Sequence, residues 1–445
     1  ANTTASLSTA VGYQAGYSQT TTANPNDWFG AQAGYYVTGG ANSAFGYNAM
    51  LGSTLGATGT GNCAFGRFSL TSLRSGSNNC AFGVGTLQNT TTGDNNVAMG
   101  YQALLTNTTG NHNTAIGLQA LLSNTTGVDN VSIGADCLRS STTASGNVSI
   151  GRFALYFNTT GSGNVAIGYD AMLRNTANNN VAVGYEAMQE NTTGSGNTAL
   201  GFNALLSNVA SNNNTAIGSA ALDASTTGNQ NTAVGAGAFG SLTSAVNGVA
   251  IGFNALAAAT TGEGNVAVGE SAGNNTTTGQ FNVLIGKFAR ASGATDNNCI
   301  VIAANNGTLG KGSNTGFIDP GAGGVFQGNN SSSWSTTSDR RLKKNIVDNN
   351  EGLEKIAGIQ IRNFEYRLPE EVDAELTPTD AIKKKGVQLG VIAQELQTVL
   401  PECVKQQSTG VLSVDTDNLT WYMINAIKQL KAEVDSLKSQ LNQGA

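Results

Sequence analysis

The sequence has few of the residues on which most catalytic and metal sites depend. Among 445 residues there is one histidine, His112, and there are five cysteines with no Cys-x-x-Cys pair. An odd number of widely spaced cysteines predicts neither a zinc site nor a disulfide framework. A single histidine excludes most His-dependent catalytic and metal-binding designs within one chain. We therefore expect no metal and no cofactor.

Long apolar runs and positive charge are missing too. No apolar run approaches the ~18 residues that a spanning helix needs, so no membrane span is predicted. The formal net charge is −6, which argues against a nucleic-acid-binding surface. Residues 1–337 contain 8 Lys/Arg and 12 Asp/Glu, whereas residues 338–445 contain 14 and 16. This step in charge density predicts a domain boundary between residues 337 and 338.

A short unit repeats along most of the chain. From Gly66 to Gly286 the glycine of an Ala-apolar-Gly core recurs every 17 residues, with one 16-residue step. Looser copies have their core glycines at Gly12, Gly30 and Gly46. Each unit carries two short strand-like pieces separated by Asn, Thr and Gly turns. A unit of this length is too short for two packed helices and suits one coil of a β-solenoid, in which each strand pairs in parallel with its copy above.

The repeat therefore predicts a mostly β protein with a rod-shaped solenoid shaft over residues 1–290. About 17 units rising ~4.8 Å each would span on the order of 80 Å. Stacking places Ala and large apolar side chains in interior ladders, Asn in hydrogen-bonded rows, and Gly at corners that need positive φ. A single coil cannot bury its apolar face alone, so this face must be buried either by stacking of the coils or by association of three chains.

This unit resembles the head repeats of trimeric autotransporter adhesins, which carry an Asn-Ser-x-Ala-Ile-Gly-like core. Residues 113–117 (NTAIG) and 197–201 (NTALG) are good examples. The resemblance covers about residues 8–290, although the period here is longer than that usual in the family. It implies a left-handed parallel β-roll built by three chains.

Several features of the array invite functional interpretations, and for each we favour a simpler structural one. Cys63 and Cys80 occupy the same place in successive coils, where other coils have Thr or Val, so we predict small buried thiols and no disulfide. Recurring Asn-x-Thr sequons predict turns, not glycosylation; examples are Asn107, Asn124, Asn158 and Asn191. Tyrosines that follow the core glycine could stack on sugar rings, but packing is the preferred interpretation; they are Tyr13, Tyr47, Tyr101, Tyr169 and Tyr185.

Carboxylates are scattered through the array without a pattern. Glycoside cleavage needs two carboxyl groups facing each other across a cleft at ~5–10 Å, and the spacing pairs none in this way. The residues are Asp94, Asp129, Asp136, Asp170, Glu186, Glu190, Asp223, Glu263 and Glu270. Beyond them, residues 291–337 lose the period and become rich in Gly and Ser, which predicts an irregular neck or cap.

Two motifs follow the charge boundary: SDRRLKKNI at residues 338–346 and GVIAQELQTVLPECV at residues 390–404. With a terminal heptad helix, they resemble the intramolecular chaperone domain of phage tail fibres and tailspikes, the S74 peptidase type. The resemblance covers residues 338–445. It implies an α+β domain that forms a trimer, assists folding of the shaft ahead of it and then cuts itself off.

The residues at the boundary can supply that chemistry. Ser338 needs a base, and residues 338–445 contain no histidine. A lysine can act as the base if burial or neighbouring cations lower its pKa, and the resemblance points to Lys343. We predict that the Ser338 hydroxyl attacks the carbonyl of Thr337, with Asp339 orienting the turn or a donor group. This single-turnover autoproteolysis between Thr337 and Ser338 is the only enzymatic activity we expect.

The end of the chain predicts a coiled coil over residues 420–442. Apolar residues recur at alternating spacings of four and three; they are Met423, Ile427, Leu430, Val434, Leu437 and Leu441. This a/d seam predicts association between helices, and both resemblances imply three chains. Earlier in the domain, residues 356–366 alternate as in a strand, and residues 391–396 predict a helix that ends before Pro401.

These observations predict a structural viral protein. We expect a homotrimeric phage tail fibre, part of the virion, that attaches to a host surface receptor, with a glycan as one candidate. The alternative is an extracellular bacterial surface adhesin of the trimeric type that carries the same chaperone. A third class, a polysaccharide-degrading tailspike, would need a cleft with paired carboxylates. We expect no nucleic-acid partner and no membrane span, whereas a C-terminal membrane anchor would have supported the adhesin.

Overall fold

The computed structural model describes residues 8–19, 25–304, 306–320, 325–327, 335–336, 340–368, 371, 385–406 and 411–443. The chain divides into two compact units, Ala1–Thr337 and Ser338–Ala445. Each unit has its own apolar core. Among the described residues, no helix is both long enough and apolar enough to cross a membrane.

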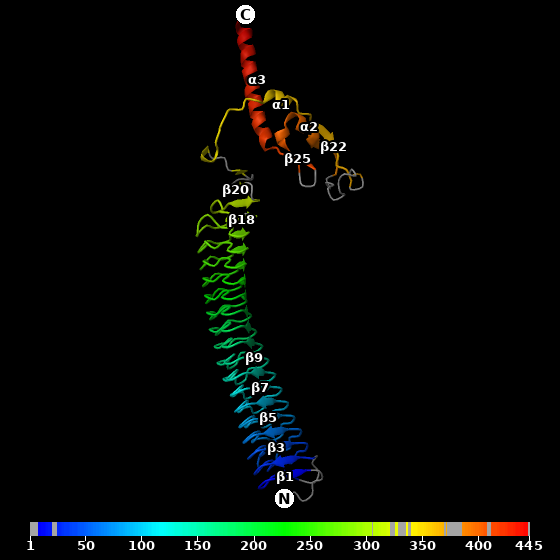
Figure 1. The fold of residues 1–445 in the computed structure, drawn as a ribbon, viewed down its shortest axis with the longest axis vertical. Coiled ribbons are helices and arrows are strands. Elements are labelled where there is room, and N and C mark those ends of the chain that lie inside the picture. Colours follow the sequence, from blue (N-terminus) through cyan, green and yellow to red (C-terminus); the bar gives the residue numbers. More distant parts are fainter. Residues whose placement is uncertain are drawn as a thin grey trace. The chain divides into compact units, whose positions relative to one another are not determined.

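The first unit is a stack of coils in which each coil contributes one short strand (Figure 1). Neighbouring strands from β1 to β19 pair in parallel, so that residues 97–99, for example, align with residues 114–116. The predicted parallel β-solenoid is confirmed. The strands are β1 (Thr9–Val11), β2 (Asp27–Phe29), β3 (Ser43–Phe45), β4 (Cys63–Phe65), β5 (Cys80–Phe82), β6 (Val97–Met99), β7 (Thr114–Ile116), β8 (Val131–Ile133), β9 (Val148–Ile150), β10 (Val165–Ile167), β11 (Val181–Val183), β12 (Thr198–Leu200), β13 (Thr215–Ile217), β14 (Thr232–Val234), β15 (Val249–Ile251), β16 (Val266–Val268), β17 (Val283–Ile285), β18 (Ile300–Ala303), β19 (Gly316–Asp319), β20 (Val325–Gln327) and β21 (Ser335–Thr336).

Each coil buries the same few positions. The middle residue of the strand, usually Ala, points inward, and an Ala-Leu or Ala-Met pair follows the next corner in most coils; Ala98, Ala103 and Leu104 are one such set. These side chains have no exposed surface within a single chain. Burying each leucine contributes about 1.5–3 kcal/mol, and the gain recurs coil after coil. Stacking alone therefore closes the interior of the shaft.

The corner after each strand from β1 to β17 requires glycine for two reasons. Gly100 has a φ of 127°, which residues other than glycine rarely adopt. A Cβ atom built on Gly100 would also lie 2.4 Å from the carbonyl oxygen of Gly117 in the next coil. The corners consequently stack backbone against backbone, and this contact explains the regular recurrence of the core glycine.

A row of buried asparagines ties successive coils together. The Nδ2 of Asn113 donates to the carbonyl oxygen of Gly127 (2.8 Å), and its Oδ1 accepts from the backbone nitrogen (3.1 Å) and Nδ2 (3.0 Å) of Asn130. A buried polar group left without a partner costs about 1–3 kcal/mol, so each amide depends on the coils above and below it. The row consists of Asn26, Asn42, Asn62, Asn79, Asn96, Asn113, Asn130, Asn147, Asn164, Asn180, Asn197, Asn214 and Asn231, and it resumes with Asn265 and Asn282.

The asparagine row is interrupted at Gly248, and an aromatic ring fills the space. The backbone nitrogen of Gly248 still donates to Oδ1 of Asn231 (2.9 Å), but Gly248 has no side chain with which to continue the row. A Cβ atom on Gly248 would lie 2.6 Å from the ring of Phe239. Phe239 is fully buried in a position that is Leu in the coils on either side. The larger side chain thus compensates for the missing amide.

The stack continues past residue 290, where the sequence predicts an irregular neck. Strand β18 lies 17 residues after β17 and pairs with it in parallel, and β19 pairs in parallel with β18. Strands β20 and β21 then add to the same sheet in antiparallel orientation. The regular part of the shaft is therefore two strands longer than the glycine period indicates, because Ala303 stands where the next core glycine would fall.

The second unit is a small α+β domain with a long terminal helix (Figure 1). Two antiparallel strand pairs, β22–β23 and β24–β25, accompany the helices. Leu396, Leu400 and Cys403 form its buried centre. The elements are η1 (Arg340–Leu342), α1 (Leu353–Ala357), β22 (Arg362–Phe364), β23 (Gln388–Gly390), α2 (Ala393–Val399), η4 (Pro401–Cys403), β24 (Val404–Gln406), β25 (Leu412–Val414) and α3 (Asp417–Gln443).

Two local predictions in this domain have different outcomes. The helix predicted at residues 391–396 corresponds to α2, which ends before Pro401. The strand predicted over residues 356–366 is wrong in its first half, because α1 occupies residues 353–357 and β22 begins at Arg362. Helix α1 packs against α3, and this tertiary contact outweighs the weak alternation of the segment.

Candidate functional site

The predicted cleavage site lies at the start of the second unit. Thr337, Ser338 and Asp339 fall outside the described residues. Lys343, the predicted base, directly follows η1, and its backbone nitrogen donates to the carbonyl oxygen of Arg340 (3.1 Å). The serine–lysine pair therefore stays a prediction.

The segment around Lys343 is exposed in the single chain. Every residue from 340 to 350 is exposed. These residues include the apolar Leu342, Ile346 and Val347, and Val347 is 84% exposed. A lysine becomes a general base when burial or neighbouring cations lower its pKa, and the single chain leaves Lys343 in contact with solvent. Apolar side chains grouped on an exposed segment mark a surface suited to a further contact.

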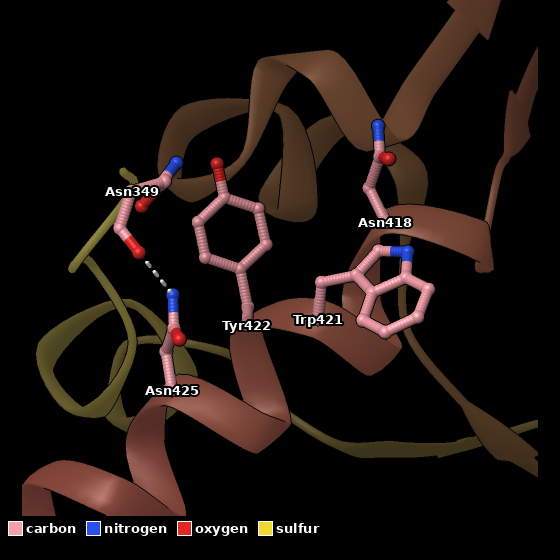
Figure 2. Close-up of a pocket in the computed structure, with 5 residues that line it drawn as sticks. All are labelled: Asn349, Asn418, Trp421, Tyr422 and Asn425. Carbon is pink, nitrogen blue, oxygen red and sulfur yellow. Dashed lines mark hydrogen bonds between the residues drawn. The ribbon is translucent and has the colours of Figure 1, made fainter. Parts of the chain in front are cut away.

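Helix α3 anchors the chain that leaves this segment. The Nδ2 of Asn425 donates to the carbonyl oxygens of Asn349 (2.8 Å) and Glu351 (3.0 Å), as Figure 2 shows for Asn349. One helical turn further on, Nε2 of Gln429 donates to the carbonyl oxygen of Asn350 (2.6 Å). Neither amide is among the functional residues predicted from the sequence. Their spacing, on the helix face opposite the apolar seam, was the available signal.

A glycine allows this anchored segment to touch the helix backbone. A Cβ atom on Gly352 would lie 2.3 Å from the backbone nitrogen of Ala426, and Ala426 is the buried residue of α3. No side chain fits between the two backbones at this point. The path of the chain from residue 349 to α1 is therefore set by α3.

A cavity of about 270 Å³ lies beside the anchor (Figure 2); it is lined by Asn349, Asn418, Trp421, Tyr422 and Asn425. The hydroxyl of Tyr422 donates a hydrogen bond to the Glu402 carboxylate. This bond raises the pKa of Tyr422 to about 12 and lowers the pKa of Glu402. Amide, indole and phenol groups of this kind offer hydrogen bonds and stacking surfaces, so the cavity is suited to contact and not to acid–base chemistry.

The apolar seam of α3 is exposed along the helix. The helix has 27 residues and is about 40 Å long. A seam of this length left in water favours association with other helices. Its exposed residues are Met423, Ile427, Leu430, Val434, Leu437 and Leu441.

The four sequon asparagines named above are internal. They are fully buried and form part of a second polar row, in which Nδ2 of Asn124 donates to Oδ1 of Asn107 (2.9 Å) and to the carbonyl oxygen of Gly127 (3.0 Å). An amide in this position closes a turn and is inaccessible to modification in the folded chain. The preferred interpretation of Asn107, Asn124, Asn158 and Asn191 as turn residues agrees with these contacts.

The five cysteines are free thiols, and the histidine lies beside an exposed carboxylate. Cys63 and Cys80 are aligned in neighbouring strands as free, half-buried thiols, less enclosed than predicted. His112 lies 3.5 Å from a carboxylate oxygen of Asp129, and both side chains are more than half exposed. Within the described part of the chain, no group of three or more His, Cys, Asp and Glu side chains could hold a metal ion.

The tyrosines after the core glycine lie on the surface; they are Tyr13, Tyr47, Tyr101, Tyr169 and Tyr185. The rings of Tyr169 and Tyr185 stack at 5.3 Å, and Tyr185 stacks on Phe202 at 5.5 Å. Asp170 and Glu186 also occupy equivalent places in successive coils, where burial and then the charge of Glu186 raise the pKa of Asp170. These carboxylates stack along one face of the shaft, as the rings do, and do not face each other across a cleft.

One comparison with known proteins bears on the second unit. Residues 338–405 match the model of the peptidase S74 family, described as chaperone of endosialidase. The match begins at Ser338 and includes both motifs found in the sequence, at residues 338–346 and 390–404. Together with the parallel β-solenoid, it fits the organisation of a tail fibre or tailspike. The chain is therefore a parallel β-solenoid shaft followed by a C-terminal domain that is similar to the peptidase S74 family.

Proposed function

We propose that the protein is a homotrimeric phage tail fibre that attaches the virion to a host surface receptor. The observation that carries the proposal is the S74 match, which begins where a long solenoid of near-identical coils ends. In this proposal the shaft is the lasting product and the second unit is an intramolecular chaperone that acts during assembly.

The shaft itself gives a physical reason for a chaperone. Successive coils present the same asparagine, glycine and alanine ladders, so a slip of one coil preserves nearly every contact. Parallel β structure also folds slowly and exposes strand edges while it forms. A domain that brings the copies together at one end fixes both their number and their alignment before the coils pair.

Helix α3 is the element that can bring the copies together. Its apolar seam is exposed in the single chain, and its opposite face holds the segment from residue 349 to residue 351. Association through the seam would align three chains in parallel and place three copies of residues 340–350 around the bundle. Those additional contacts would supply the burial that Lys343 lacks in the single chain, so cleavage would follow assembly.

The proposed cleavage is a two-step reaction. The Ser338 hydroxyl oxygen attacks the carbonyl carbon of Thr337, the amide C–N bond breaks, and an ester forms. The hydroxyl proton passes through neutral Lys343 to the new amino group, while Asp339 orients the turn. Water then hydrolyses the ester, which leaves a carboxylate on Thr337 and restores the hydroxyl. Loss of the assembly domain makes the fibre kinetically hard to take apart.

The test is the intact mass of the purified chain and of three variants: Ser338→Ala, Lys343→Ala and, as a control, Lys385→Ala, which changes an exposed lysine of the same domain. We expect the wild-type and control chains to lose the 108 residues from 338 to 445. The other two variants should stay full length and retain a three-chain mass by light scattering. Full-length mass in all four would disprove self-cleavage.

A second experiment tests the chaperone role separately. A gene encoding residues 1–337 alone should give aggregated or single-chain shaft, because nothing sets the number and alignment of the copies. Soluble three-chain shafts from this truncated gene would show that the second unit is not needed for assembly.

A further inference from the structure

Each shaft strand has two side chains on the outside of its coil, one on either side of the inward-pointing residue. The residues after the inward position form a continuous row, here called the outer column, and no member of it is buried in the single chain. It consists of Val11, Phe29, Phe45, Phe65, Phe82, Met99, Ile116, Ile133, Ile150, Ile167, Val183, Leu200, Ile217, Val234, Ile251, Val268, Ile285 and Ile302.

Every residue of the outer column is apolar, and strand formation alone does not explain this. Thr forms strands about as readily as Val or Ile, and it is frequent on the other side of the same strands. The residue before the inward position is polar in seven coils: Thr9, Asp27, Ser43, Thr114, Thr198, Thr215 and Thr232. If the outer column faced solvent, polar residues such as Thr could replace Val or Ile there as well. No polar residue occurs in the outer column from β1 to β18, which indicates that this column is covered in the functional protein.

The dimensions of the column suit an interface between proteins. At ~4.8 Å per coil, β1 to β18 extend over roughly 80 Å. A strip about 10 Å wide would cover on the order of 800 Å², which is the share of one partner in a standard interface and exceeds the largest apolar patch of most monomers. Near its start, the rings of Phe29, Phe45, Phe65 and Phe82 stack at 4.5 to 4.8 Å and present one continuous apolar surface.

The periodicity of the column identifies its occupant. A partner that covers it without leaving gaps needs apolar groups at the same spacing over the same length, and a second copy of this chain has them. The exposed apolar seam of α3 likewise favours association between copies of the chain. We infer that the outer column is the surface along which parallel copies of this chain pack coil for coil. This inference rests on the homotrimer proposed above and adds which face of the shaft lies inside.

Thiol accessibility in the assembled fibre tests the inference. Met99 is 48% exposed in the single chain, and Thr109, on the turn of the same coil, is also exposed. The variants Met99→Cys and Thr109→Cys are treated with a maleimide under native conditions, and labelling at each position is followed by peptide mass spectrometry, which separates it from the native thiols. We expect the thiol at position 99 to react at least about tenfold more slowly than that at position 109, because access controls reactivity.

Light scattering on the same samples separates the possible outcomes. A three-chain mass with slow labelling at position 99 supports the inference. A three-chain mass with equal labelling overturns it and leaves the homotrimer intact. A single-chain mass contradicts the homotrimer, and the inference fails with it.

A pair of charge variants gives a second readout. Ile217→Glu places a carboxylate in the outer column, and Thr215→Glu places one on the other side of the same strand, β13. Circular dichroism should show that both retain the coil structure. The change at position 217 should release chains from the assembly at lower denaturant concentration than the change at position 215; equal effects would count against the outer column as the interface.

Discussion

The Phe239–Gly248 pair allows a double-mutant test of how the shaft interior is filled. In Gly248→Asn, the new Cβ would lie 2.6 Å from the Phe239 ring, and such overpacking costs about 1–3 kcal/mol. In Phe239→Leu, the shorter side chain leaves a void beside Gly248, which costs about 1 kcal/mol or more. The double variant has the leucine found in the neighbouring coils, and the side-chain oxygen of the asparagine introduced at position 248 can accept a hydrogen bond from Asn265. We expect it to be about as stable as the wild type, with a coupling energy of about 2–4 kcal/mol.

Hydrogen exchange is the suitable assay, because a stack of coils that contact mainly their neighbours need not unfold in one step. Exchange of backbone amides from residue 231 to residue 265 should quicken in each single variant, by about tenfold for each 1.4 kcal/mol of local destabilisation. In the double variant, exchange should return to the wild-type rate. Amides from residue 97 to residue 131 serve as the internal control and should not change. If the two single effects simply add in the double variant, the ring does not occupy the space of the missing amide.

Three further predictions follow from contacts described above. Gly100→Ala should destabilise its coil by about 2–5 kcal/mol, measured by local hydrogen exchange, because the new Cβ would meet the Gly117 oxygen at 2.4 Å and the φ of 127° is strained for alanine. Leu430→Glu should lower the mass of the uncleaved chain in sedimentation from three chains toward one, and an unchanged mass would remove α3 from the assembly surface. In Tyr422→Phe, the pKa of Glu402 should rise toward its ordinary value in a carboxyl NMR titration, because the phenol hydrogen bond lowers it. The wild type should therefore be more stable than the variant at pH values above the pKa of Glu402 in the unfolded chain. This difference should disappear as the pH falls through the lowered pKa of Glu402 in the folded chain.

Much of the shaft could be predicted because its contacts repeat in the sequence. The glycine period fixes the coil length, and the spacing of asparagines reveals the polar row. The backbone of the turn was harder to predict. Gln102 and Leu104 have φ values of 55° and 51°, a left-handed conformation that is unusual for leucine. A signal was present, since the position of Leu104 holds Leu, Met or Phe from Gly46 to Gly252 and never a β-branched residue, whose side chain would clash there.

The second unit was less predictable because its contacts join distant residues. Asn425 binds backbone atoms 74 and 76 positions earlier, and nothing near residue 349 in the sequence indicates that partner. Helix α1 replaced a predicted strand for the same reason, since its environment is supplied by α3. Ser338 and Lys343 were identified through a family resemblance, which carries information about residues whose arrangement local patterns do not determine.

The stacked corner of Gly100 and Gly117 has a consequence for how such a molecule can change over generations. Every corner fits the next one equally well, so the gene can gain or lose a whole unit of 17 residues without disturbing the fit. Each event alters the length of the shaft by about 4.8 Å, and insertions of other sizes must be absorbed in a loop, as in the 20-residue step from Gly46 to Gly66. The length of the shaft is thus an inherited quantity that varies in discrete steps of one coil.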